Sequence, residues 1–205
     1  MRMTLSRLLH TLIAALALLL VSSPARAQQF SDSYQFIEAI KKQDGGKVMQ
    51  ILTDTNGSVI NTKDKSNGEG ALHIVARQGD STWLRYLIQK GANPNIQDDR
   101  GNTPMMIAVE LSYAEGVQIL LRYGANVNLA NSSGETPLIR AVQLRKLDLV
   151  RILLEGGADP DKPDNLAGQS ARDYARIDRR MPPSIAKLLA DAPKVNRAAV
   201  SGPKL

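Results

Sequence analysis

The 205-residue chain lacks cysteine, has only 4% aromatic residues and contains two histidines. Without cysteine it can form neither a disulfide nor a thiolate metal site, so its stability has to come from packing. The scarcity of aromatic side chains argues against a broad stacking surface for nucleic-acid bases. His10 lies in an N-terminal apolar run, which leaves His73 as the one histidine available for a site. We therefore expect no catalytic, metal-binding or cofactor-binding residues.

Two stretches resemble ligand motifs only superficially. Residues 45–47, Gly-Gly-Lys, lack the spacing of a phosphate-binding loop. Asp159, Asp161 and Asp164 alternate as calcium ligands do, but prolines stand between them and no glutamate closes the loop. There is also no G-x-S-x-G element to place a nucleophile. We interpret the aspartate stretch as a solvated loop.

The net charge of +6 is concentrated at the ends of the chain. Six of the 26 basic residues lie before Gln28 or after Ala192, which leaves 20 basic against 20 acidic residues between them. A nucleic-acid-binding protein needs a dense basic face to displace counterions. The sequence therefore predicts no nucleic-acid partner.

Residues 1–27 have the pattern of a secretory signal peptide. Arg2 and Arg7 precede an apolar run of about 14 residues, and Ala25-Arg26-Ala27 forms a small-x-small cleavage site. The run is short against the roughly 20 residues needed to span a bilayer, so an uncleaved anchor is the weaker alternative. We expect cleavage after Ala27, a polar leader at 28–33 and no stable membrane insertion afterwards.

The middle of the chain repeats itself every 33 residues. Stretches beginning at Gly68, Gly101 and Gly134 share one pattern, and Gly-Ala-Asn or Gly-Ala-Asp recurs at 91, 124 and 157. A fixed period of this size predicts a stacked array of small units rather than one globular core.

These units resemble ankyrin repeats, since they share the period and variants of the T-P-L-H-x-A signature. The resemblance implies an all-α ankyrin solenoid of about five helix-turn-helix units, joined by β-hairpin-like loops. It also implies that the imidazole of His73 bonds backbone groups of adjacent loops. We place the repeat domain at 34–191, with an atypical N-terminal cap at 34–66, repeats at 67–99, 100–132 and 133–166, a C-terminal cap at 167–191 and a disordered tail at 192–205.

One repeat shows why the residues form these elements. Thr103 precedes Pro104 and should cap the first helix, which runs to about Leu111. The second helix is predicted over 115–123, and Gly124 should end it in the left-handed conformation. Trp83 is expected to be partly buried, whereas Tyr113 and Tyr123 are better candidates for exposure. In the first unit we expect helices over 34–42 and 46–53.

The resemblance further implies a partner surface on the concave face, made of the hairpin tips and the exposed side of the first helices. Leu111 and Leu144 hold equivalent places there. Two interpretations stay open: the leucines form the apolar centre of an interface, or they tuck against the next hairpin. The candidate residues are Arg77, Gln78, Asp99, Arg100, Asn102, Glu110, Leu111, Ser132, Ser133, Glu135, Gln143 and Leu144, with Ser66, Asn67 and Glu69 in the first hairpin.

The leading hypothesis is a monomeric, non-enzymatic module that binds a protein partner in the periplasm of a Gram-negative bacterium. A second hypothesis is a secreted, extracellular effector or inhibitor that acts on a host or competitor protein. A third, an enzyme or small-ligand protein, is disfavoured by the single usable histidine and by an array only one repeat deep.

Export makes a direct prediction about the mature chain. Because cleavage should follow Ala27, the intact mass of exported protein should lack residues 1–27 and begin at Gln28. A full-length mass recovered in the membrane fraction would contradict this.

Overall fold

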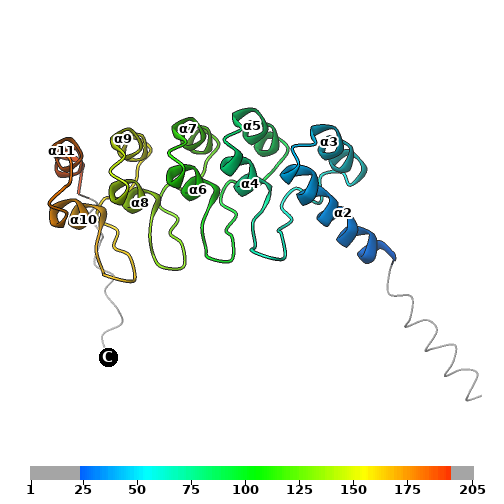
Figure 1. Cartoon of the computed structure of the whole chain (residues 1–205), viewed down its shortest axis with the longest axis horizontal. Helices are drawn as coiled ribbons and strands as arrows, with labels where there is room; N and C mark the ends of the chain where they lie inside the picture. The colour runs from blue at the N-terminus through cyan, green and yellow to red at the C-terminus, as the bar shows by residue number, and fades with distance from the viewer. Residues whose placement is uncertain (1–23, 195–205) are drawn as a thin grey trace, which may run out of the picture.

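The computed structural model describes residues 24–194, which form a single row of helix pairs (Figure 1). The predicted all-α fold is confirmed, and within these residues the only β-pairing is an isolated bridge between Lys63 and Gly70. The described helices are α2 (Pro24–Lys41), α3 (Gly45–Asp54), α4 (Ala71–Gln78), α5 (Ser81–Gln89), α6 (Pro104–Glu110), α7 (Ala114–Arg122), α8 (Pro137–Gln143), α9 (Leu147–Glu155), α10 (Ala171–Ile177) and α11 (Pro183–Asp191).

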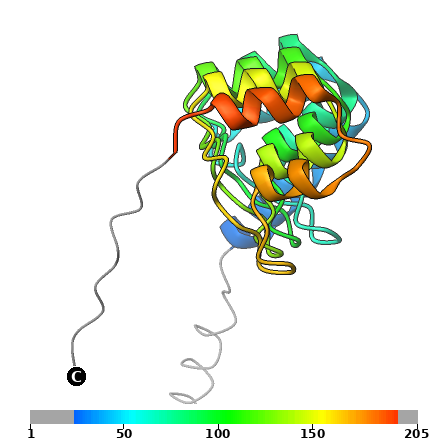
Figure 2. The same ribbon diagram turned by 90° about the vertical axis from the view of Figure 1, so that its left-hand side faces the viewer.

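The helices lie in two parallel layers. Seen along the array, the first helices of the units (α2, α4, α6, α8, α10) form one layer and the second helices the other, while the hairpin loops project to one side (Figure 2). The two helices of each unit pack on one another, and helices of the same layer pack between successive units, with α3 and α5 as the exception. The stability of each unit is therefore tied to its neighbours.

Threonine and proline begin the first helices where the sequence predicts. The hydroxyl oxygens of Thr103 and Thr136 accept hydrogen bonds from the amides of Met106 and Ile139, both at 3.2 Å. A proline follows each threonine at the first helical position. The proline costs nothing there because that amide has no partner in a helix.

The core repeats with the sequence. Leu87, Leu120 and Leu153, one 33-residue period apart, have no exposed surface in the second helices. Ala76, Ala108 and Ala141 are equally buried in the first helices, as expected if these helices pack closely.

Asparagine side chains join the loops that follow the second helices of successive units. The amide oxygens of Asn61, Asn95 and Asn128 each accept a backbone N–H from the next unit, at 2.7 Å in all three cases. Asn61 and Asn128 also donate to the carbonyls of Gly91 and Gly157. These bonds fix the register between units.

Several expectations about the ends and the tyrosines were wrong. The first described helix begins at Pro24, not Tyr34, and therefore includes the polar stretch 28–33. Tyr113 and Tyr123 are half-buried: Tyr113 packs on Gly116, where a methyl group would overlap its ring, and the Tyr123 hydroxyl accepts from Gln89. Of the signal peptide and tail, residues 1–23 and 195–205 lie outside the described residues.

In the last described unit, Arg172 stands at the position that Leu138 holds in the unit before. Its guanidinium pairs with the carboxylate of Asp161 at 2.8 Å. It also donates to carbonyls at the end of α11, including those of Leu189 and Ala192. These carbonyls have no helical partner. Arg172 thus satisfies polar groups at the end of the last described helix.

The repeated leucines predict the size of a stability loss. Leu120→Ala or Leu153→Ala should each lower the free energy of unfolding by about 2–5 kcal/mol, because each leaves a cavity between packed helices. Urea unfolding followed by circular dichroism would measure this. Leu166→Ala is the control, because this hairpin leucine is 82% exposed and should change stability by less than about 0.5 kcal/mol. Equal effects for all three would show that the helix register is wrong.

Candidate functional site

The hairpin tips stack edge to edge along the array. Each tip donates a backbone amide to the preceding one: Asp99 to Asn67 at 3.1 Å, Ser132 to Arg100 at 3.0 Å, and Asn165 to Ser133 at 2.9 Å. Four consecutive tips therefore form a continuous, ordered edge. Side chains on this edge hold fixed positions relative to one another.

Acidic and amide side chains stabilise the hairpin tips by accepting hydrogen bonds from backbone amides of the same tip. Asp98 accepts from the amides of Arg100 and Asn102, and Asn131 accepts from those of Ser133 and Glu135. Such bonds replace the turn's missing backbone partners. The tips are thus built before any partner binds.

His73 joins two units, as the resemblance implied. Its Nδ1 accepts the amide of Gly70 at 3.1 Å, so Nε2 carries the proton and donates to the carbonyl of Asn102 in the next unit, at 2.9 Å. Gly70 has no side chain to cap α4; its carbonyl accepts the amide of His73 at 3.0 Å, while the His73 ring accepts the amide of Gly70. Burial lowers the pKa of His73, which stabilises the neutral form. The role of His73 is structural.

A groove of about 730 Å³ runs between the hairpin tips and the first helices of the central units. Most of the predicted surface residues line it, whereas Met106, Ile107, Asn131 and Arg140 were missed by sequence reasoning. Met106 and Ile107 are buried core residues that expose little surface to the groove, and nothing in the repeat pattern identifies them as part of it. The predicted residues that line the groove are Arg77, Asp99, Arg100, Asn102, Glu110, Leu111, Ser132, Ser133 and Glu135.

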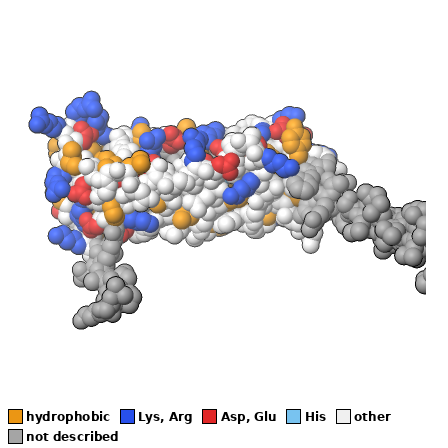
Figure 3. Space-filling model, turned by 90° about the horizontal axis from the view of Figure 1, so that it is seen from below, with side chains coloured by type: hydrophobic (Ala, Val, Ile, Leu, Met, Phe, Trp, Pro, Cys, Tyr) orange, Lys and Arg blue, Asp and Glu red, His pale blue; other side chains and the backbone are white. Residues whose placement is uncertain are grey.

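The charges of the groove are largely paired. Arg140 and Glu110, from successive units, form an ion pair at 2.8 Å, and Arg77 pairs with Glu69. Asp99 and Arg100, exposed side by side on one tip, form no ion pair with any described residue. Basic and acidic side chains are interspersed along this side of the molecule (Figure 3). The groove thus offers mixed polarity rather than a field of one sign.

Glu135 is a half-buried carboxyl of the groove. Burial raises its pKa, and the amide of Asn131 donates to it at 3.3 Å. A raised pKa often accompanies catalysis. Here no cluster of metal-ligating groups accompanies Glu135 among residues 24–194, and the only histidine of that range, His73, is bonded to Gly70 and Asn102. The arrangement suits recognition by hydrogen bonds.

Six of the fifteen candidate residues lie outside the groove lining, and three of them, Ser66, Asn67 and Glu69, belong to the first hairpin. Gln78 donates to the carbonyls of Ile40 and Lys41 and so caps the end of α2. Gln143 and Leu144 lie further along the array, where Gln143 is exposed and Leu144 half-buried. Leu111, by contrast, is 47% exposed and lines the groove.

The aspartate stretch is not the solvated loop that the sequence suggested. Asp164 is buried, and its carboxylate accepts the amides of Leu166 and Ala167 and the hydroxyl of Tyr174. These bonds lower the pKa of Asp164 despite the opposing effect of burial. The carboxylate therefore shapes the last hairpin.

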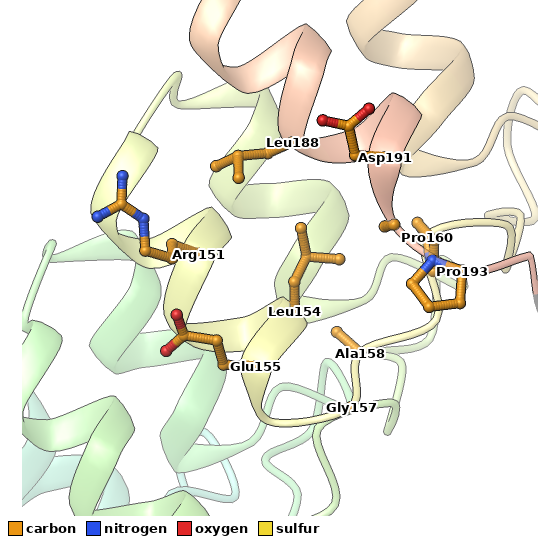
Figure 4. A pocket seen from close by; sticks show the side chains of 10 residues that line it. Arg151, Leu154, Glu155, Gly157, Ala158, Pro160, Leu188, Asp191 and Pro193 are labelled. Atoms are coloured by element: carbon orange, nitrogen blue, oxygen red, sulfur yellow. The ribbon is translucent and has the colours of Figure 1, made fainter.

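A second hollow, of about 500 Å³, lies between the outer helices α9 and α11. Leu154 and Leu188 lie across it from one another, with Pro160 and Pro193 at one end and Arg151 and Glu155 at its rim (Figure 4). It is an apolar surface with no convergent set of polar groups, and no sequence signal marks it.

The comparisons agree with the repeat pattern. A family model described as "Ankyrin repeats (3 copies)" matches residues 36–131 and 92–164. The chain is 31% identical over 73 residues to "Nuclear factor NF-kappa-B p110 subunit" of Drosophila melanogaster, covering 35% of this chain and 8% of that protein. It is 35% identical over 77 residues to "Neurogenic locus notch homolog protein 1" of Homo sapiens, covering 38% and 3%. It is 31% identical over 87 residues to "2-5A-dependent ribonuclease" of Homo sapiens, covering 42% and 12%. The chain thus matches only a small part of each relative.

The buried histidine predicts how stability depends on pH. Because its pKa is lowered in the folded state, the unfolded chain binds more protons below about pH 6.5, and stability should fall as the pH falls through this value. Urea midpoints of the natural chain and of His73→Gln, measured between about pH 5 and 7.5, would check this. The variant should be less stable at neutral pH and show a shallower pH dependence. Parallel curves would contradict the assignment.

Proposed function

The chain belongs to the ankyrin repeat family, and from this premise we propose that it is a non-enzymatic module that binds a protein partner through its concave groove. Ankyrin repeats generally mediate protein–protein interaction. The observation that carries the proposal is the groove itself, about 730 Å³ between ordered hairpin tips and first helices. A preformed surface loses little conformational entropy when a partner binds.

The chemistry of the groove is suited to a folded or extended polypeptide. It combines an exposed leucine with paired charges, hydroxyls and amides, a mixture typical of protein interfaces. Leu111 provides an apolar contact, while Asp99 and Arg100 remain free to pair with a partner. Changing the charge of Arg77 or Glu110 would mainly alter the association rate and its salt dependence.

Catalysis has little support. Ankyrin repeat domains are typically non-enzymatic. The relative named as a ribonuclease aligns with this chain over only 12% of its own length. Any activity of the relatives' other parts belongs to those proteins.

We propose that the protein acts in the periplasm, because residues 1–27 have the pattern of a signal peptide. Among residues 24–194, no helix has the length and apolarity to cross a bilayer. The alternative is a secreted effector or inhibitor. Cell fractionation separates the two, because retention in the periplasm supports the first and recovery from culture medium the second.

The equivalent positions of Leu111 and Leu144 on the concave face predict that these two leucines matter for binding. Leu111→Ser combined with Leu144→Ser should weaken partner binding by about 2 kcal/mol or more if the pair forms an interface centre. Folding should be largely retained, because Leu111 is exposed and both residues follow the last helical turn. Periplasmic extract passed over the mature chain would identify the partner, and titration calorimetry would give the affinity.

Leu166→Ser is the matched control, since this leucine is more exposed but lies on the last hairpin outside the groove. Unchanged affinity of the double variant would reject this surface. Loss of both helicity and binding would instead show that the leucines belong to the core.

A further inference from the structure

The loops that join the paired helices form one edge of the concave face, here called the loop rim: residues 111–113, 144–146 and 177–182. Apolar side chains recur along it. Leu111 is 47% exposed, Leu144 is half-buried and Ile177 is 57% exposed. Ile177 ends α10, one position before the place that the two leucines hold. An apolar row thus crosses the last three units.

The same loops carry unpaired positive charge. Lys146, Arg179 and Arg180 are exposed, and none forms an ion pair with another described residue. Lys146 begins α9, and the two arginines follow α10. Three cations therefore flank the apolar row where it reaches the last two units.

The acidic groups nearby do not cancel this charge. The carboxylate of Asp178 is occupied by Arg145, at 2.7 Å, and by the amide of Arg180 at 2.9 Å. This ion pair also links the loops of the last two units. Asp148, exposed in the first turn of α9, offsets one cation. The rim keeps a net positive charge.

The distribution of charged residues along the whole repeat domain also shows an excess of positive charge near this rim. Residues 167–194 contain six basic and three acidic side chains, whereas residues 67–166 contain 10 basic and 12 acidic. Lys and Arg side chains gather at the C-terminal end of the molecule in Figure 3. Positive charge is therefore a local property of this end of the array.

The spacing of the apolar row indicates which kind of secondary structure in a partner would match it. The first helices α6, α8 and α10 pack side by side, and packed helices lie about 8–10 Å apart. A partner helix advances about 1.5 Å per residue, so residues seven apart lie about 10.5 Å apart on one face. A partner strand presents same-face residues about 6.6 or 13 Å apart and does not match.

We propose that the loop rim binds an acidic amphipathic helix of the protein partner. Apolar residues at seven-residue intervals would contact Leu111, Leu144 and Ile177, while glutamate or aspartate beside them would pair with Lys146, Arg179 and Arg180. This inference rests on the proposed function and specifies the chemistry of the partner. The groove shares Leu111 with the rim, whereas Lys146, Ile177, Arg179 and Arg180 lie outside the groove lining.

Synthetic peptides test this directly with the mature full chain. The probe is a labelled helix of about 21 residues with leucine at every seventh position and glutamate on either side. The comparison peptide has the same composition with leucine at every fifth position. By fluorescence anisotropy the heptad peptide should bind about tenfold more tightly, and its affinity should fall as salt is added.

Variants place the contact on the rim. Arg179→Glu combined with Arg180→Glu should weaken binding of the heptad peptide about tenfold or more, and Ile177→Ser should weaken it without changing the salt dependence. The matched controls are Arg122→Glu, an exposed arginine in the last turn of α7, and Leu166→Ser on the last hairpin. Both controls should bind as the natural chain does.

Other outcomes overturn the inference. Equal binding of the two peptides would show that the rim does not recognise the seven-residue spacing. An equal loss of binding in Arg122→Glu would show that the charge variants act only through the net charge of the protein. Binding to phosphatidylglycerol vesicles that the heptad peptide cannot displace would assign the rim to a membrane surface. If the natural partner is lost from the Leu111 and Leu144 double variant but retained by the Arg179 and Arg180 variant, the proposed function stands and the acidic helix falls.

Discussion

The register between successive units is the constraint on which this structure depends. No unit can bury its own apolar face, so Leu87, Leu120 and Leu153 are buried only because the next helix pair covers them. Hydrogen bonds hold that register at two places. The asparagines at 61, 95 and 128 join the loops that follow the second helices, and backbone bonds join the hairpin tips. A slip of one residue would break both sets together. The 33-residue period is thus a physical requirement of the stack.

Residues whose role is repeated were predictable from the sequence, and so was the fold. Thr103 and Thr136 begin helices because a hydroxyl can satisfy a free amide, and this chemistry is the same wherever it occurs. The left-handed turns between paired helices were not foreseen, because only one of the four carries glycine. Gln43, Ser112 and Arg145 adopt φ of 56°, 57° and 55°, against 72° for Gly79. There the packing of the two helices imposes a backbone conformation that local preference opposes.

The candidate site was predictable in its position but not in its chemistry. Nine of the fifteen candidate residues line the groove because the repeat pattern alone decides which side chains leave the stack. The pattern cannot show which of them already have partners. Gln78 is committed to the end of α2, and Arg77 to Glu69. Tyr113 was misjudged for the same reason: Gly116, one turn later, leaves room for its ring, and this is visible only when both are placed.

Stability and binding share several contacts on this face. Arg140 and Glu110 belong to successive units, and their ion pair lies in the groove, while Arg145 and Asp178 join the two units that carry the cationic part of the loop rim. A partner that lies across these units holds together interfaces that isolated units cannot maintain, so its binding energy adds to the stability of the stack. Surface ion pairs of this kind contribute at most about 1 kcal/mol each. Breaking one of these ion pairs when a partner binds therefore costs little free energy. The same side chains can then pair with charges of the partner while the fold is kept.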